Sequence, residues 1–461
     1  MKLSHVAPVR SAVFDDPNLV SCAGLVPVVG LAQRAGLGAL VDRHVGVGGG
    51  AGHGGGAKVT ALVAGMVAGA DSIDDMDLLR HGGMGRLFTG VRAPSTLGTF
   101  LRSFTFGHVR QLDAVASRFL IALAGQGPLL PGADQVTYVD VDDTVKATFG
   151  YAKQGAGYGY SGVKGLNALI ATISTPLAAP VIAATRLRKG SANSARGAAR
   201  LVTDALITTR AAGATGMVIV RADSAYYGHD VIAAARRRGA YFSVTARKDR
   251  AVTAAIASIE EQGWTTIRYP KAVFDEPSGC WISDAQVAEI AFTAFTSRRA
   301  SEHVTGRLIV RRVRDANPDH QVADAQGELF ATWRHHAVFT DSPLPMLQAE
   351  ATHRQHAIIE QVIADLKGGP LAHLPSGSFA ANSAWLVCAA IAFNLTRAAG
   401  ALASGFHAKA TTATIRAHLI SVPGRIARSA RTAVLHLPTA WPWESAWQQL
   451  FNTGTGPPPA A

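Results

Sequence analysis

The pattern of apolar and polar positions along the chain changes near residue 129. Before that point apolar side chains recur with helical spacing, for instance over residues 28–35, and after an interruption at Gly36 the pattern continues over residues 37–41. Helix, short glycine turn, helix is the pattern of a DNA-binding helix-turn-helix, although most helical hairpins bind no nucleic acid. We predict a mainly helical region over residues 1–128.

Short runs rich in β-branched and apolar residues follow this region and indicate strands. They lie at residues 136–142, 166–174, 179–185, 217–222 and 241–245. Two stretches between them, residues 195–210 and 229–238, have the composition and spacing of helices. The order of three strands, helix, strand, helix, strand predicts a mixed α/β sheet.

A change in composition after residue 249 indicates an insertion into this α/β region. Proline, tryptophan and short β-like runs, such as residues 307–312 and 328–333, characterise the insertion, and helical spacing returns after Pro343. The end of the chain is rich in proline and tryptophan and is expected to be frayed. The predicted division is residues 1–128 (helical), 129–249 (first part of an α/β core), 250–342 (β-rich insertion), 343–435 (helical second part of the core) and 436–461 (flexible tail).

Two aspartates follow predicted strands. Asp142 ends the first strand in the sequence Asp140-Val141-Asp142, and Asp223 follows the buried strand over residues 217–222. Side chains two residues apart share one face of a strand, so Asp140 and Asp142 point the same way. Ligands of α/β sheets gather at the carboxyl ends of strands, where both aspartates fall. An aspartate at a strand end is also a common turn or cap residue.

A glutamate lies in the helix predicted over residues 353–367. The apolar stripe of this helix consists of Ile359, Val362, Ile363 and Leu366. A polar stripe along its edge consists of His353, His356, Glu360 and Lys367. Such an edge can line a cleft, although a glutamate with a lysine seven residues later is also typical of a solvated helix face.

Three carboxylates are a suitable set for phosphodiester chemistry. Cleavage requires an activated water or hydroxyl and stabilisation of the charge on the phosphate, and two Mg²⁺ ions about 4 Å apart supply both. Because Mg²⁺ takes hard oxygen ligands, Asp142, Asp223 and Glu360 are candidate ligands, with one aspartate bridging both ions. A lysine or histidine beside them can contact the phosphate or the leaving strand.

The charge balance favours a polyanionic partner. The 461 residues include 44 Lys and Arg against 32 Asp and Glu, which gives a net charge of +12. Phosphate contacts and counterion release give a basic protein affinity for nucleic acid. Basic proteins of other classes have a similar balance, so charge alone does not decide the partner.

The sequence lacks the motifs that are typical of several other classes of protein. Cys22, Cys280 and Cys388 are far apart, which argues against a zinc site or a disulfide framework and fits a reducing cytoplasm. The glycine-rich run 46–56 lacks the ending of a phosphate-binding loop. No signal peptide is evident, and the apolar run 384–393 is shorter than the about 20 residues of a membrane span, so we expect a buried helix and no membrane partner.

Three segments together resemble the acidic motifs of bacterial insertion-sequence transposases of the DDE type. They are YVDVDDT, VIVRADSAYYG and HRQHAIIEQVIADLKGG. Further similar pieces are Lys153-Gln154-Gly155, Tyr158-Gly159-Tyr160, Lys164-Gly165 and Ala381-Asn382-Ser383-Ala384-Trp385. The chain in particular resembles the insertion-sequence family numbered thirteen-eighty, and the likeness covers roughly residues 20 to 430.

The resemblance implies an RNase H-like core that binds two Mg²⁺ ions, or Mn²⁺ in their place, through Asp142, Asp223 and Glu360. Asp140 is the alternative to Asp142. The family pattern on the glutamate helix is Tyr, Arg, Glu, Lys; here two histidines stand at the first two positions, while Glu360 and Lys367 are retained. The residues implied as DNA phosphate contacts are Lys367, His356, His353 and Arg354.

In such enzymes the β-rich insertion often presents an aromatic side chain that stacks on a flipped base. The candidates are Trp264, Trp281 and Trp333. Stacking contributes about 1 to 3 kcal/mol per base. A tryptophan in a small hydrophobic core is the alternative for each of them.

The function implied by the resemblance is cut-and-paste DNA transposition in the bacterial cytoplasm, at the nucleoid. The N-terminal helices would bind the terminal inverted repeats of double-stranded DNA, a homodimer would hold two element ends, and the core would cleave a strand and join it to target DNA. The alternatives are an RNase H-like nuclease, an inactive transposase that acts as a DNA-binding repressor, and a small-molecule α/β enzyme. Strand transfer, metal-dependent cleavage and salt-sensitive DNA binding separate them.

Overall fold

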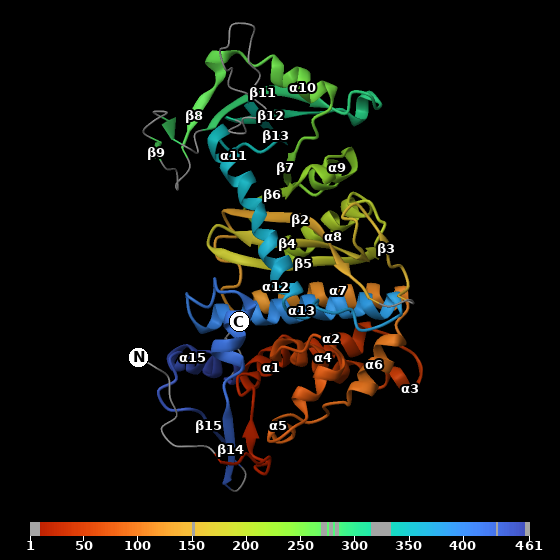
Figure 1. Ribbon diagram of the computed structural model, residues 1–461, viewed down its shortest axis with the longest axis vertical. Helices are drawn as coiled ribbons and strands as arrows, with labels where there is room; N and C mark the ends of the chain where they lie inside the picture. The colour runs from red at the N-terminus through yellow and green to blue at the C-terminus, as the bar shows by residue number, and fades with distance from the viewer. Residues whose placement is uncertain are drawn as a thin grey trace.

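The computed structural model describes residues 10–149, 153–268, 274–275, 280–281, 285–314, 333–429 and 432–456. These residues form an elongated α/β molecule in which a long sheet lies against a layer of helices, with further helices beyond that layer (Figure 1).

Helices make up most of the chain before the central sheet. They are α1 (Leu25–Arg34), α2 (Leu37–His44), α3 (Gly49–Gly52), α4 (Gly55–Ala68), α5 (Met84–Leu87), α6 (Pro94–Arg102) and α7 (Phe106–Ala124). Gly36 separates α1 from α2 in a left-handed conformation, with φ of 75°. The two helices are bent by 47° at this break. The predicted order of helix, short glycine turn and helix is present in α1 and α2.

The centre of the sheet consists of five strands in the order β5-β4-β2-β6-β7. They are β2 (Val136–Ala147), β4 (Lys164–Thr175), β5 (Ala178–Lys189), β6 (Met217–Ala222) and β7 (Tyr241–Thr245). Neighbours are antiparallel from β5 to β2 and parallel from β2 to β7. Helix α8 (Ala198–Ala211) connects β5 to β6, and α9 (His229–Arg237) connects β6 to β7. The predicted order of strands and helices is confirmed.

The strands after β7 extend this sheet. They are β13 (Trp333–Thr340), β12 (Val304–Arg314), β11 (Ala285–Ala294) and β8 (Thr265–Ile267), in that order away from β7. β13 pairs antiparallel with β7, for example Phe339 with Val244. The segment from residue 250 to 342 also includes α10 (Arg250–Ala257) and the two-stranded pair β9 (Phe274–Asp275) and β10 (Cys280–Trp281). Because β13 pairs with β7, the strands of the insertion continue the central sheet. This pairing also covers the edge that β7 would otherwise expose to solvent. Residues 328–332 of a predicted strand lie outside the described residues.

The helix predicted over residues 353–367 is broken into two. α11 (Met346–Arg354) and α12 (Ile358–Lys367) are joined by the 3₁₀ turn Gln355–Ala357. His353 therefore lies on a different helix from Glu360, and the two do not share one continuous stripe.

Helix α13 (Phe379–Ala403) lies between the sheet and the N-terminal helices (Figure 1). By length and composition it could cross a membrane, but 94% of its apolar stretch is buried inside the protein. Helices α1 and α2, if counted together as one bent span, are also long and apolar enough to cross a membrane. The expected buried helix over residues 384–393 is confirmed, because packing against both layers accounts for its apolar character.

The tail is folded as far as it is described, so the predicted flexible tail over residues 436–461 is wrong for residues 436–456. β14 (Gly424–Ser429) and β15 (Thr432–His436) form a small sheet with β1 (Leu19–Val20), and α15 (Glu444–Thr455) packs on α1 and α13. A Cβ atom added to Gly30 of α1 would lie 2.5 Å from the carbonyl oxygen of Gly454, so the two helices approach closely there. Burial of Trp447 and Leu450 on one side of α15 provides the physical reason for its docking.

Candidate active site

Two aspartates come together where β6 ends beside β2. In this parallel pair Val141 lies opposite Ala222, so Asp142 and Asp223 follow in register. β2 continues beyond Asp142 to Ala147 and remains paired with β4. Asp142 therefore lies within the strand, and the prediction that it ends the strand is wrong. The end of β6 leaves one side of Asp142 accessible, as expected at the carboxyl edge of a parallel pair.

Burial and neighbouring acidic groups disfavour the charged form of Asp142. Burial raises its pKa to about 7, and the charges of Asp223, Asp143 and Glu360 act in the same direction, against a hydrogen bond from the Asp143 N–H. Burial also raises the pKa of Asp223, whose side chain accepts a 3.0 Å hydrogen bond from the N–H of Ala225. Carboxylates in this situation are stabilised by a cation placed among them.

Helix α12 supplies Glu360 and Lys367. Its predicted apolar stripe is confirmed, since Ile359, Val362, Ile363 and Leu366 are all buried. The charge of Glu360 acts on Asp142, and the charge of Asp142 acts on Lys367, whose pKa is lowered by burial and by Lys146. One helix therefore brings an acid and a base to the same aspartate. Lys146 on β2 was not singled out in the sequence.

His353 is a docking residue of α11. Its side chain is 4% exposed, and its ring nitrogens lie 2.9 Å from Ser243 Oγ and 3.0 Å from Thr245 Oγ1 on β7. Burial lowers the pKa of His353 to about 3, so the ring is neutral near pH 7. The predicted phosphate contact at His353 is therefore wrong.

His356 and Arg354 differ in their surroundings. The charge of His356 acts on both Asp140 and Asp223, which places this residue beside the aspartates. Its Nδ1 lies 2.9 Å from the carbonyl oxygen of His353. Arg354 instead pairs with Glu350 of α11 at 2.8 Å. Of the predicted phosphate contacts, Lys367 and His356 are the two that lie beside the carboxylates.

Asp140, the alternative first ligand, is fully buried and already paired. Its two carboxylate oxygens accept hydrogen bonds from Nε and Nη2 of Arg221 at 2.6 and 2.7 Å. This pairing leaves Asp142 as the aspartate of β2 that is open to a ligand. Arg221 was not identified from the sequence, although an arginine inside an apolar strand signals a buried acidic partner.

A second buried network lies behind the site. Asp143 accepts hydrogen bonds from the Tyr226 hydroxyl at 2.9 Å, from Arg188 at 2.8 Å, and from Asn167. Asp143 follows Asp142, and Tyr226 lies in the turn after Asp223. The network therefore connects the backbone segments that carry both aspartates.

Two of the three tryptophan candidates already have a stacking partner. The guanidinium of Arg312 lies 4.2 Å from the ring centre of Trp264 and 4.5 Å from that of Trp333. Both rings are partly buried. The side chain of Trp281 lies outside the described residues. Trp264 and Trp333 therefore pack against Arg312, which is the alternative to a base-stacking role.

The family model described as Transposase DDE domain group 1 matches residues 7–453 of the chain. The chain belongs to this family of DDE transposases. The match includes β2, β6 and α12. No curated protein matched the chain in a sequence comparison. Membership implies an enzyme that acts on DNA in transposition, in a family that generally uses divalent metals.

The carboxylates that would hold a metal ion in the transposase interact in two pairs, Asp142 with Asp223 and Asp142 with Glu360. Among the residues that the structure describes, no three Asp, Glu, His or Cys side chains are arranged to hold one ion. Asp142 is nevertheless near enough to both Asp223 and Glu360 to interact with their charges. Carboxylate oxygens are the donors that hard divalent cations take, so the donor chemistry fits such an ion.

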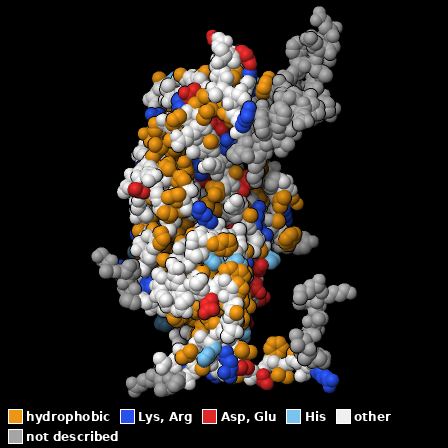
Figure 2. Space-filling model, turned by 90° about the vertical axis from the view of Figure 1, so that its left-hand side faces the viewer, with side chains coloured by type: hydrophobic (Ala, Val, Ile, Leu, Met, Phe, Trp, Pro, Cys, Tyr) orange, Lys and Arg blue, Asp and Glu red, His pale blue; other side chains and the backbone are white. Residues whose placement is uncertain are grey.

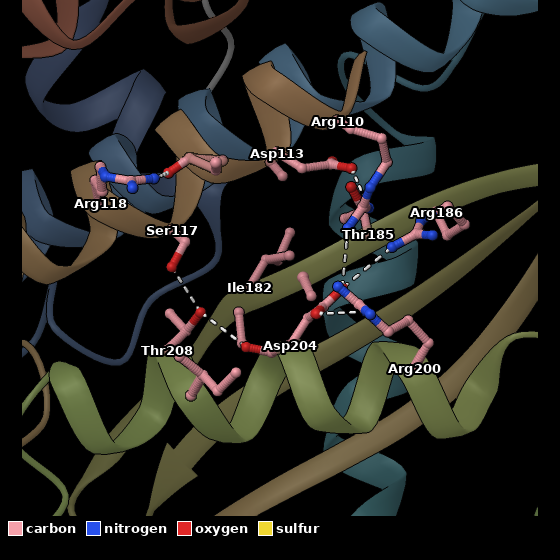
Figure 3. A pocket seen from close by; sticks show the side chains of 16 residues that line it. Arg110, Asp113, Ser117, Arg118, Ile182, Thr185, Arg186, Arg200, Asp204 and Thr208 are labelled. Atoms are coloured by element: carbon pink, nitrogen blue, oxygen red, sulfur yellow. Dashed lines mark hydrogen bonds and ion pairs between the residues drawn. The ribbon is translucent and has the colours of Figure 1, made fainter. Parts of the chain in front are cut away.

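A charged cavity of about 260 Å³ lies elsewhere in the transposase, between α7, β5 and α8 (Figure 3). At its centre Asp204 pairs with Arg110, Arg186 and Arg200 at 3.0–3.3 Å. Asp113 pairs with Arg110 at 2.6 Å, but burial outweighs this contact and raises the pKa of Asp113 to about 6. The cluster joins a helix of the N-terminal part to the sheet layer.

The positive charge of the transposase is dispersed on the face drawn in Figure 2. Among the described residues there, Lys and Arg side chains are scattered between hydrophobic and uncharged ones and are not gathered into one band. On that face the net charge of +12 therefore forms no single basic track.

Proposed function

We propose that this protein is a cut-and-paste transposase in which Asp142, Asp223 and Glu360 bind two Mg²⁺ ions, or Mn²⁺ in their place, and catalyse DNA cleavage and strand transfer. The observation that supports the proposal is that the charges of Asp223, which follows β6, and of Glu360 on α12 both act on Asp142 of β2. The ions would supply an activated oxygen nucleophile and neutralise the charge that develops on the phosphate.

The proposed core is RNase H-like. Its support is the strand order β5-β4-β2-β6-β7, antiparallel on one side of β2 and parallel on the other, with helical crossovers α8 and α9. In this arrangement β2 is central, and α12 lies against β2 and β5. The central strand and the helix that covers it thus bring the first aspartate and the glutamate together.

Lys367 and His356 are the proposed contacts to the DNA backbone at this site. Both lie beside the carboxylates, and a lysine ammonium binds phosphate as a compact point charge. Lys146, whose charge acts on Lys367, adds to the positive potential there. These cations would hold the scissile strand while the acids hold the metal.

The N-terminal helices are proposed to bind the terminal inverted repeats, and a homodimer is proposed to hold two DNA ends. The net charge of +12 supports DNA as the partner. A basic protein that binds through phosphates loses affinity steeply as salt rises, because the bound counterions are released.

The deciding experiment is cleavage of a labelled duplex that carries the terminal repeat of the element, with and without Mg²⁺. Wild type is expected to cut at the repeat boundary only with metal and to join the freed 3′ end to a second duplex. Asp142→Asn, Asp223→Asn and Glu360→Gln are expected to bind the duplex and to lose cutting by a factor of about 10³ or more, since each removes a carboxylate of the site.

Asp230→Asn is the matched control, because Asp230 is an acid in the first turn of α9 whose side chain is 78% exposed and pairs with His229. It is expected to cut like wild type. Cutting without strand transfer would support the nuclease alternative. Binding of the repeat with no cutting in Mg²⁺ or Mn²⁺ would support the repressor alternative and contradict the proposal.

A further inference from the structure

Arg221 lies on β6 and contacts β2 and α11, the helix that precedes the glutamate helix α12. It lies two residues before Asp223, and its side chain is 2% exposed. Across the parallel pair it lies opposite Asp140, which is two residues before Asp142 on β2. Both oxygens of Asp140 accept its hydrogen bonds, at 2.6 and 2.7 Å.

The remaining terminal nitrogen of Arg221 reaches helix α11. Nη1 donates a 2.6 Å hydrogen bond to the carbonyl oxygen of Thr352, in the last turn of α11. Carbonyl groups in the last turn of a helix have no partner within the helix, and an arginine can satisfy them. Just beyond this point the 3₁₀ turn Gln355–Ala357 leads into α12, which carries Glu360.

Packing alone does not hold this junction. A cavity of about 520 Å³ lies beside it, lined by Arg221 and Tyr138 and, on the helix side, by Gln355, Ala357, Ile358 and Gln361. Since side chains of the junction face open space, the hydrogen bond to Thr352 is a main restraint on its position, together with the docking of His353 on β7.

The geometry of the guanidinium suits this task. Its Cζ atom lies 4.0 Å from the centre of the Tyr138 ring, and its donors point in fixed directions. A buried ion pair is weak evidence of net stabilisation, because apolar residues of similar size often serve as well. A role in positioning therefore explains the buried charge better than a role in stability alone.

We propose that Arg221 is a positioning residue: by holding the end of α11 against β2 and β6, it sets the place of Glu360 relative to Asp142 and Asp223. The inference rests on the proposed function of these three carboxylates. Arg221 itself is buried and acts through the segments that it contacts.

The test compares the full-length Arg221→Lys variant with wild type in Mn²⁺ binding, measured by paramagnetic resonance, and in amide hydrogen exchange. A lysine can pair with Asp140 but cannot also reach Thr352 with the same geometry. We expect Mn²⁺ affinity to fall at least tenfold and amide exchange over residues 352–360 to speed up at least tenfold, with amide exchange in the sheet unchanged.

Arg397→Met is the matched control. Arg397 is a buried arginine of α13 that donates to the carbonyl groups of Ala408 and Ala410, so its loss should lower the melting temperature without changing Mn²⁺ affinity. If Arg221→Lys does not fold, the double variant Asp140→Leu/Arg221→Met replaces the pair with apolar residues and is expected to show the same two changes.

A folded variant with wild-type Mn²⁺ affinity and wild-type exchange would overturn the inference and leave Arg221 as a structural ion pair. If wild type binds no Mn²⁺ at millimolar concentration, the proposed metal-dependent function fails instead. In that case the exchange over residues 352–360 still decides whether Arg221 positions the junction.

Discussion

At the scale of single residues, buried charges flank Asp142 on both faces of β2. Asp140 pairs with Arg221 on one face, and Asp143 pairs with Arg188 on the other, because neighbouring residues of a strand point to opposite faces. Burying a carboxylate is unfavourable unless it is paired and hydrogen-bonded, and both of these are. Asp142, between them, forms no ion pair with the described residues, which leaves it available for a ligand.

Tyr226→Phe tests the second of these networks. The change removes the hydroxyl that donates to Asp143 at 2.9 Å, at a position that is fully buried. Since the lost bond is to a charged acceptor, the free energy of unfolding should fall by about 1.5–3 kcal/mol. Urea denaturation monitored by circular dichroism measures it.

Tyr227→Phe serves as the control for that measurement. Tyr227 is the neighbouring residue, and its hydroxyl makes no hydrogen bond to the described residues, so a change within about 0.5 kcal/mol is expected. Equal effects of the two substitutions would contradict the role assigned to the Tyr226 hydroxyl.

At the scale of elements, apolar periodicity predicts which side of a helix is buried but not where the helix breaks. The stripe of α12 is buried as predicted, yet α11 is a separate helix because His353 docks on β7 and Thr352 is held by Arg221. The tail shows a similar limit. Its proline and tryptophan content suggests fraying, whereas α15 is held by apolar contacts with α1, an element more than 400 residues away in sequence.

Trp447→Ala tests the docking of α15. The side chain is 5% exposed and stacks on Phe451 with ring centres 5.3 Å apart. Truncating a buried tryptophan removes apolar contacts and leaves a cavity, so the free energy of unfolding should fall by about 3–5 kcal/mol. Gln448→Ala, at an exposed position of the same helix, should change it by less than about 0.5 kcal/mol. An unchanged melting temperature for Trp447→Ala would mean that α15 is not docked.

At the scale of the whole molecule, one sheet and one buried helix hold the parts together. The sheet extends from β5, through the strands β2 and β6 beside the carboxylates, to β8. The insertion and the core are therefore joined by continuous backbone hydrogen bonding between strands. α13 contacts β5 and the helices α4, α6 and α7, and α7 itself also contacts β5. The charged cluster of α7, β5 and α8 adds a polar joint between the same layers (Figure 3).

The pH dependence of the free energy of unfolding should reflect the protonation of Asp113 in this charged cluster. Burial raises the pKa of Asp113 from 3.8 to about 6, so the folded protein binds this proton more tightly than the unfolded chain. Its contribution is therefore fully present below about pH 4 and is lost as the pH rises through about 6. Relative to Asp113→Asn, wild type should lose up to about 3 kcal/mol between these values.

Melting curves of both proteins from pH 4 to pH 8 test this expectation, and the difference between them removes the contributions of other carboxylates. A constant difference over this range would show that Asp113 titrates normally and that its burial is not maintained in solution.

What the sequence by itself determined is local. Alternating and helical patterns located β2, β6 and the apolar stripe of α12, because side-chain period depends only on neighbouring residues. The motif residues Asp142, Asp223 and Glu360 could be named from the same segments together with a family resemblance. Which of them meet, and what surrounds them, depends on partners far away in the chain.

Three features could be seen only in the tertiary structure: Asp140 is paired with Arg221, His353 contacts β7, and β13 continues the sheet. Each outcome rests on a contact between residues about 80 or more positions apart, such as Arg221 and Asp140. Composition and periodicity do not encode which distant polar groups pair, because many pairings satisfy the same local pattern. The fold selects among them by burial, which requires that every charged group removed from water finds its partner.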